Sequence, residues 1–193
     1  MAAKLSAAGL DFIASWSPYV ETAFKFEDDP TNKNTYVGYS YYGSQLAYKP
    51  FNTVDDSSTT TVSAAKETLL EELQGPCFNL VKDFSFTRFT QAEFDALVSI
   101  CTTYRRSDYY DFFKGTDVYT ALVNKSDKAT VAGLIKNLGV PTYVSDNYKR
   151  SHIFYDIATR RANEADLFEN GTYTNCTGLT YQTKDEGGVK VLY

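Results

Sequence analysis

The sequence is poor in the residues that most often carry metal or redox chemistry. Its 193 residues include one histidine, His152, and three cysteines, Cys77, Cys101 and Cys176. The odd number of cysteines and the lack of a C-x-x-C pair argue against a disulfide framework or a zinc knuckle. A single histidine gives a catalytic triad no choice of base, and the acidic run at 27–29 lacks the alternating ligands of a calcium loop. We therefore expect no metal and no cofactor.

Positive charge and long apolar runs are also scarce. The 19 basic residues are outnumbered by 24 acidic ones, so the net charge is −5, which argues against a nucleic-acid partner. No segment approaches 18 apolar residues, and residues 1–16 lack the apolar core of a signal peptide. We expect neither membrane insertion nor secretion, and we expect folding in a cytoplasm.

Aromatic residues, in contrast, are abundant. The chain has 16 tyrosines and 13 phenylalanines, and its apolar content of 43% is ordinary for a globular protein. This length is sufficient for one good core. We expect one domain with a tail, and tyrosines that are half-buried or at interfaces.

Local signals predict a helix, then strands, then a series of helices. Ser6 caps a helix with apolar residues at Leu10, Ile13 and Trp16, and Pro18 ends that helix. Residues 22–49 favour a two- or three-stranded antiparallel sheet that turns around residues 29–32.

Helical patterns then continue to about residue 169. A helix over 61–75 stops at Gly75-Pro76, a capping box at Thr90 and Glu93 opens another, and further helices are predicted over 108–124, 126–138 and 145–168. Residues 172–193 turn to Thr, Tyr and Val around a DEGG turn, which is typical of a hairpin or a partner-binding tail. The order of elements predicts an α+β fold.

Four sequence blocks stand out in order along the chain: LSAAGLDFIASW (5–16), VSAAKETLLEEL (62–73), FTQAEFDALVSI (89–100) and RRANEADLF (160–168). Together they resemble the T4-type phage lysozymes, which cleave the β-1,4 bond of peptidoglycan. The resemblance implies a lysozyme-like domain over 1–171, with a sheet lobe at about 20–60, a helical lobe at 61–171 and a C-terminal extension at 172–193. It assigns Arg160, Arg161 and Glu164 to the structural closing helix rather than to the site.

The resemblance also implies where catalytic residues should lie. The family has a glutamic acid at the end of the first helix, an aspartate on the sheet and a threonine six residues later. Asp29 and Thr35 match the last two, but counts from both sides place Ser17 where the glutamic acid should be. A serine hydroxyl cannot act as the general acid. Loss of acid assistance slows such a reaction on the order of 10²- to 10⁴-fold.

Glu21 is the alternative acid, four residues after Ser17. It could replace the missing group if the end of the helix is rearranged, because one helical turn is only about 5 Å; a solvated strand residue is the simpler interpretation. Tyr39, Tyr41 and Tyr42 lie on the sheet that would line the cleft. These rings either stack on sugars or pack against neighbouring parts of the protein.

We therefore predict a lysozyme-fold phage protein without its general acid, which serves as a tail or baseplate component, structural or docking on peptidoglycan. The acidic net charge favours this, because a freely diffusing hydrolase of an anionic polymer gains from being basic. The alternative is an active muramidase, an endolysin or tail-associated lysozyme, using Glu21, Asp29 and Thr35. A third interpretation is an inhibitor-like binding protein. Expected partners are peptidoglycan and other phage structural proteins, in a virion assembled in the host cytoplasm.

Overall fold

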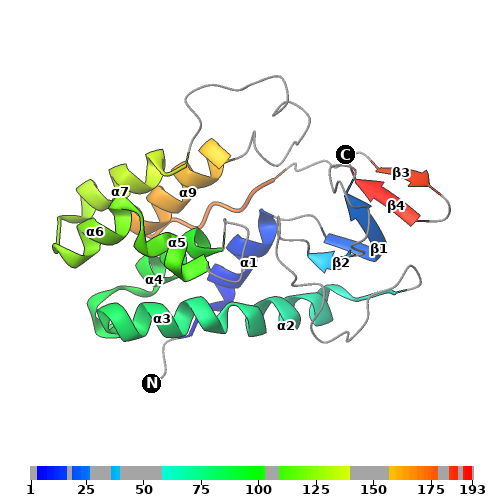
Figure 1. Cartoon of the computed structure of the whole chain (residues 1–193), viewed down its shortest axis with the longest axis horizontal. Helices are drawn as coiled ribbons and strands as arrows, with labels where there is room; N and C mark the ends of the chain where they lie inside the picture. Colours follow the sequence, from blue (N-terminus) through cyan, green and yellow to red (C-terminus); the bar gives the residue numbers. More distant parts are fainter. Residues whose placement is uncertain are drawn as a thin grey trace.

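The computed structural model has a helical part and a small sheet that lie side by side (Figure 1). It describes residues 4–16, 19–26, 36–39, 58–102, 109–139, 157–177, 183–186 and 189–192. The elements in chain order are α1 (Ala7–Ser15), β1 (Tyr19–Phe26), β2 (Tyr36–Tyr39), α2 (Val62–Glu72), α3 (Gln74–Phe84), η2 (Phe86–Arg88), α4 (Gln91–Cys101), α5 (Tyr109–Lys114), α6 (Asp117–Val123), α7 (Lys128–Asn137), α9 (Ile157–Asn170), β3 (Thr183–Glu186) and β4 (Val189–Leu192). This arrangement confirms the predicted α+β class.

The sheet is mixed and has the strand order β2-β1-β4-β3. β1 and β2 are antiparallel, as predicted, with an irregular register between Val20 and Phe24. β3 and β4 form an antiparallel hairpin, and β4 also pairs in parallel with β1 over Phe24–Phe26. The sequence pattern did not predict this parallel pairing, because it joins strands from opposite ends of the chain. The sheet therefore includes residues that the sequence boundaries assigned to a C-terminal extension.

Two helix boundaries differ from the prediction. The helix expected over 61–75 ends at Glu72 and a new helix, α3, begins at Gln74, so Gly75-Pro76 is not a stop signal. A proline is accepted in the first turn of a helix because its missing N–H would have no partner within the helix there. The helix expected over 108–124 is instead α5 and α6, and the Thr116 side chain caps α6 by accepting from the Tyr119 N–H.

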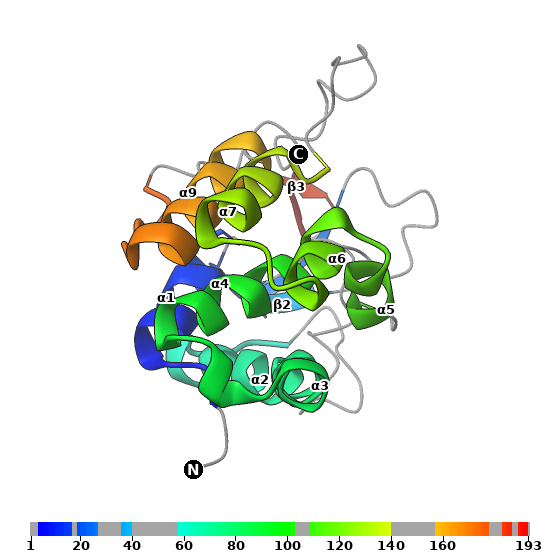
Figure 2. The same cartoon turned by 90° about the vertical axis from the view of Figure 1, so that its left-hand side faces the viewer.

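Helix α4 forms the centre of the helical part (Figure 2). Every residue from Phe94 to Cys101 is buried, and α4 contacts α1, α3, α5 and α9. The predicted capping box is confirmed: the Glu93 N–H donates to the Thr90 hydroxyl at 3.3 Å, and the Thr90 N–H donates to the Glu93 carboxylate at 2.8 Å. Local capping thus begins the helix around which the core forms.

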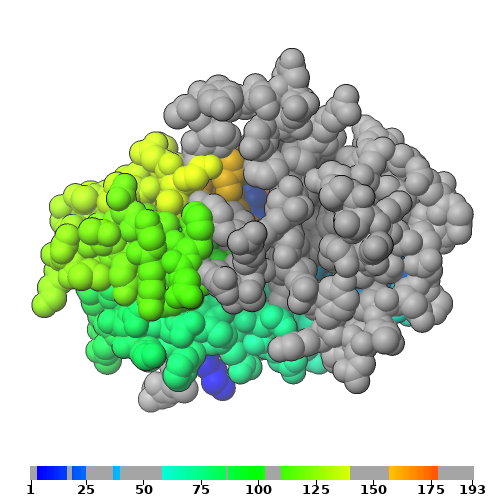
Figure 3. Space-filling view, in the orientation of Figure 1, coloured from blue at the N-terminus to red at the C-terminus, as the bar shows by residue number. Residues whose placement is uncertain are grey.

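The chain leaves α9 at Gly171, whose φ of +75° favours glycine. Residues 172–177 then cross from the helical part toward the sheet as an extended segment (Figure 1). The helices between residues 62 and 139 make up the left-hand part of the surface seen in Figure 3. Within the described ranges, no helix is long and apolar enough to cross a membrane.

Candidate functional site

Helix α1 leads directly to the position where the sequence comparison expects an acid. Its N-cap is Ser6, whose hydroxyl accepts from the Gly9 N–H at 2.9 Å. Gly9 lies so close to α4 that an added Cβ would be 2.5 Å from the Asp95 Cγ. The helix ends at Ser15, and Trp16 is its C-cap. The first helix therefore ends just before residue 17, as Pro18 in the sequence predicted.

Glu21 lies within β1, five residues beyond the C-cap of α1. Its carbonyl accepts from the Thr60 N–H at 2.9 Å, and the Ala23 N–H donates to the Ser58 carbonyl at 2.9 Å. These bonds hold the backbone around Glu21 in an extended conformation, while the carboxyl side chain is exposed. Burial raises the pKa of Tyr19, and the nearby Glu21 carboxylate adds to that rise. Glu21 is therefore a strand residue rather than part of the helix end.

Tyr39 lies in β2 directly opposite Tyr19. The two ring centroids are 5.4 Å apart, and the Tyr19 hydroxyl donates to the Thr60 carbonyl at 2.9 Å. Tyr39 is half-buried and packs against the hydrophobic core. Burial raises the pKa of Tyr39. The Lys66 ammonium lowers this pKa, and the Asp11 carboxylate raises it further. Lys66 and Asp11 form an ion pair between α2 and α1, so Tyr39 lies where β2 meets these two helices.

The other predicted site residues lie outside the described part of the chain. These are Ser17, Asp29, Thr35, Tyr41 and Tyr42. Their roles remain predictions.

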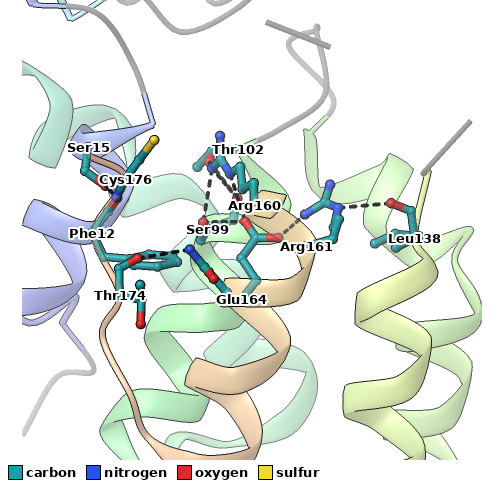
Figure 4. A network of polar contacts seen from close by, with 11 residues as sticks. Phe12, Ser15, Ser99, Thr102, Leu138, Arg160, Arg161, Glu164, Thr174 and Cys176 are labelled. Atoms are coloured by element: carbon teal, nitrogen blue, oxygen red, sulfur yellow. Dashed lines mark hydrogen bonds and ion pairs between the residues drawn. The ribbon is translucent and has the colours of Figure 1, made fainter. Parts of the chain in front are cut away.

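The side chains of α9 form a buried charged network that joins α9 to α4 and α7 (Figure 4). Glu164 is completely buried and pairs with both Arg160 and Arg161. The Arg160 Nε donates to Glu164 at 3.0 Å, and the Ser99 hydroxyl donates to the same carboxylate oxygen at 2.6 Å. Arg160 Nη2 also donates to the Thr102 hydroxyl at 3.0 Å. Buried charges are tolerated when they are paired and hydrogen-bonded in this way.

Arg161 extends the network in the other direction. Its Nε donates to the Leu138 carbonyl at the C-cap of α7 at 3.0 Å. The sequence analysis assigned Arg160, Arg161 and Glu164 to a structural helix but did not find Ser99 and Thr102. The sequence signal for these two residues was a polar side chain at the end of an otherwise apolar helix. The arrangement fixes the end of α4 against α9.

Metal ligands are not gathered anywhere in the described ranges. No group of three or more His, Cys, Asp or Glu side chains there is placed to hold a metal ion. Cys77 and Cys101 are buried and Cys176 is partly buried. Burial raises the pKa of the Cys77 thiol to about 11, which makes a reactive thiolate at that position unfavourable.

Comparison with known proteins places this fold among lysozymes. No family model matches the chain. A curated relative, the endolysin of Bacillus phage PZA, is 25% identical over 181 residues, which are 94% of this chain and 61% of the endolysin. The chain thus spans about three-fifths of that relative's length.

Solved structures with the same fold include the muramidase domain of SpmX from Asticaccaulis excentricus. It has a TM-score of 0.59 and 25% identity, and the match covers 86% of this chain and 97% of that one. A P22 lysozyme variant has a TM-score of 0.61, 19% identity and coverage of 86% and 97%. An endolysin of the Escherichia coli phage FAHEc1 has a TM-score of 0.55 and 21% identity, and the match covers 89% of this chain and 96% of that one. Fold and sequence similarity together relate the chain to the lysozyme-like muramidases, as the sequence blocks predicted.

Proposed function

We propose that this protein binds peptidoglycan with a lysozyme fold and hydrolyses it poorly, because the general acid is missing. The similarity to a phage endolysin and to a muramidase domain supports the substrate class. The observation that carries the loss of catalysis is the end of α1. The helix ends at Ser15 and Trp16, so the residue that follows is Ser17, where the family resemblance expects a glutamic acid.

The position of Glu21 supports the same proposal. A glycosidase needs a protonated carboxyl beside the leaving oxygen and a second, ionised carboxyl across the cleft. Glu21 is in β1, where its backbone bonds to Thr60, and its carboxyl is exposed. A general acid of this kind lies in an apolar pocket, and the exposed position of Glu21 on a strand does not provide one.

We further propose that the protein acts in the phage particle, as a tail or baseplate component that docks on the cell wall. Its net charge of −5 suits a docking subunit better than a diffusing enzyme of an anionic polymer. Large apolar side chains are exposed on several helices, including Phe78, Phe112 and Val123. The placement in a virion rests on analogy with lysozyme domains of phage tails.

An active muramidase is the second candidate, and one observation favours it. Glu21 is exposed on β1, the strand that leads into the segment with Asp29 and Thr35. A carboxyl in that position can meet a glycan that binds along the sheet. This candidate requires that hydrolysis depend on Glu21.

Two assays with purified peptidoglycan separate these functions. Co-sedimentation measures binding, and release of reducing ends measures hydrolysis. We expect the protein to sediment with peptidoglycan and to release few reducing ends, with no change in Glu21→Gln. Hydrolysis that disappears in Glu21→Gln would establish the active muramidase instead. Absence of both binding and hydrolysis would reject both candidates.

A gain-of-function variant tests the role of residue 17 directly. Ser17→Glu restores the acid, and Ser17→Gln is the matched control with the same size and no acid. We expect hydrolysis to rise in Ser17→Glu and not in Ser17→Gln. The rise should be at most the roughly 10²- to 10⁴-fold in rate that a general acid contributes. Equal activity in the two variants would show that residue 17 is not the missing acid.

A further inference from the structure

The segment that follows α9 is held at several points along the helical part. The Tyr173 hydroxyl donates to the Asp95 carboxylate in α4 at 2.7 Å. The Thr174 carbonyl accepts from the Asn163 side-chain amide at 3.3 Å. These bonds connect the segment to both α4 and α9.

A third contact lies at the end of α1. The Cys176 N–H donates to the Ser15 hydroxyl at 2.9 Å, and that hydroxyl donates to the Phe12 carbonyl at 2.7 Å (Figure 4). The Cys176 side chain also packs against the hydrophobic core. The segment therefore contacts α1 two residues before Ser17.

The same stretch of chain then completes the sheet. β4 pairs in parallel with β1 at Phe24–Phe26, and β3 forms the outer edge. On the other side of β1, β2 pairs with it and contacts α2. The sheet therefore contacts the helices through β2, and on its β4 side the C-terminal segment links it to them.

We propose that residues 171–177 and the β3–β4 hairpin (183–186 and 189–192) act as a strap that fixes the sheet against the helices and opens before the helical core unfolds. Between Gly171 and Thr177, only Tyr173 and Cys176 are even partly buried. Segments with few buried contacts and exposed backbone open at a lower free energy than the core does. The core helices α4 and α9, in contrast, share the buried charged network. Opening of the strap would free β1 near residues 24–26 while those helices stay folded.

Cys176 is a natural reporter for this opening, and Cys77 and Cys101 report on the core. We suggest alkylating the native full chain with iodoacetamide and following each cysteine by mass spectrometry. The double variant Tyr173→Phe with Ser15→Ala removes two strap bonds. We expect Cys176 to react on the order of tenfold faster or more, from the usual strength of two hydrogen bonds, while Cys77 and Cys101 stay protected.

Tyr119→Phe is the matched control. The Tyr119 hydroxyl donates to Asp83 at 3.0 Å, so this change removes a similar bond away from the strap. We expect no change in Cys176 reactivity. An unchanged Cys176 rate in the double variant, or an equal rise in the control, would overturn the strap. If the double variant unfolds, with all three cysteines reactive, the single variant Ser15→Ala is used with the same criteria.

The effect on the sheet needs its own measurement. Spin labels at Thr22→Cys and Lys136→Cys, both exposed positions, report the distance between β1 and α7 in a Cys176→Ser background. We expect the double variant to broaden the distance distribution and to speed amide exchange at residues 24–26. An unchanged distribution and unchanged exchange would show that the strap does not hold the sheet, and would reject the proposal even if Cys176 becomes reactive. None of these readouts depends on peptidoglycan binding.

Discussion

The helical part and the sheet are stabilised in different ways. In the helical part, local caps such as that of Thr90 begin helices, and a buried network around Glu164 joins them. The sheet combines strands from three separate stretches of chain, and some of its side chains, such as Glu21, are exposed. The comparison teaches that the helical part combines local caps with a buried charged network, whereas the sheet depends on the pairing of strands distant in the chain.

The largest expected effect is removal of the Glu164 carboxylate. Glu164→Ala leaves Arg160 and Arg161 buried without the charge that both contact, and breaking such a buried pair lowers the free energy of unfolding by about 3–5 kcal/mol. Urea unfolding followed by circular dichroism measures this. Glu169→Ala, at an exposed position of the same helix, should change stability by less than about 0.5 kcal/mol. Similar losses in both variants would contradict the special role of the network.

Next in size is the close contact between α1 and α4. Gly9→Ala places a methyl group 2.5 Å from the Asp95 Cγ, and Asp95 is held by donors from Ser6, Gln91 and Tyr173. Overpacking of this kind costs about 1–3 kcal/mol, which thermal unfolding can detect.

The matched control for Gly9 is another helical glycine with open space. Nothing lies within 4 Å of a Cβ added to Gly133 in α7, so Gly133→Ala should be stabilising by roughly 0.5–1 kcal/mol. Opposite signs for the two glycines are the expected result. A stabilising Gly9→Ala would show that α1 does not pack as closely on α4 as described.

A smaller effect is expected at the start of the central helix. Thr90→Ala removes the capping box with Glu93 and should cost about 1 kcal/mol. Thr159→Ala, at an exposed position in α9, is the control and should be nearly neutral. Equal urea midpoints for the two variants would indicate that α4 is held by packing alone.

The smallest effect concerns pH and the strap. Burial and the hydrogen bond to Asp95 raise the pKa of Tyr173 from 10.0 to about 12. Because the neutral form is favoured in the folded state, its stabilising contribution is present below pH 10 and is lost as pH rises through about 12. Cys176 accessibility should therefore rise with pH over this range. In Tyr173→Phe this pH dependence should be absent, and its persistence would assign the effect to another group.

Local signals predicted much of the helical part and little of how it is held together. The capping box at Thr90, the end of α1 before Pro18 and the antiparallel pairing of β1 and β2 follow from neighbouring residues, and all three are confirmed. The Gly75-Pro76 stop was wrong, because a proline in a first turn and a proline after a last turn look alike in sequence. Of the candidate site, the structure describes Glu21 and Tyr39, while Ser17, Asp29 and Thr35 remain predictions.

The sequence by itself determined the fold class, because caps, apolar periodicity and family blocks are properties of short stretches. Only the tertiary structure decided that Ser99 and Thr102 meet Arg160, and that β4 lies beside β1. These contacts join residues distant in the chain, and their free energy comes from burial and pairing that exist only after folding. No local pattern specifies such a partner, so the strap and the charged network could be seen only in three dimensions.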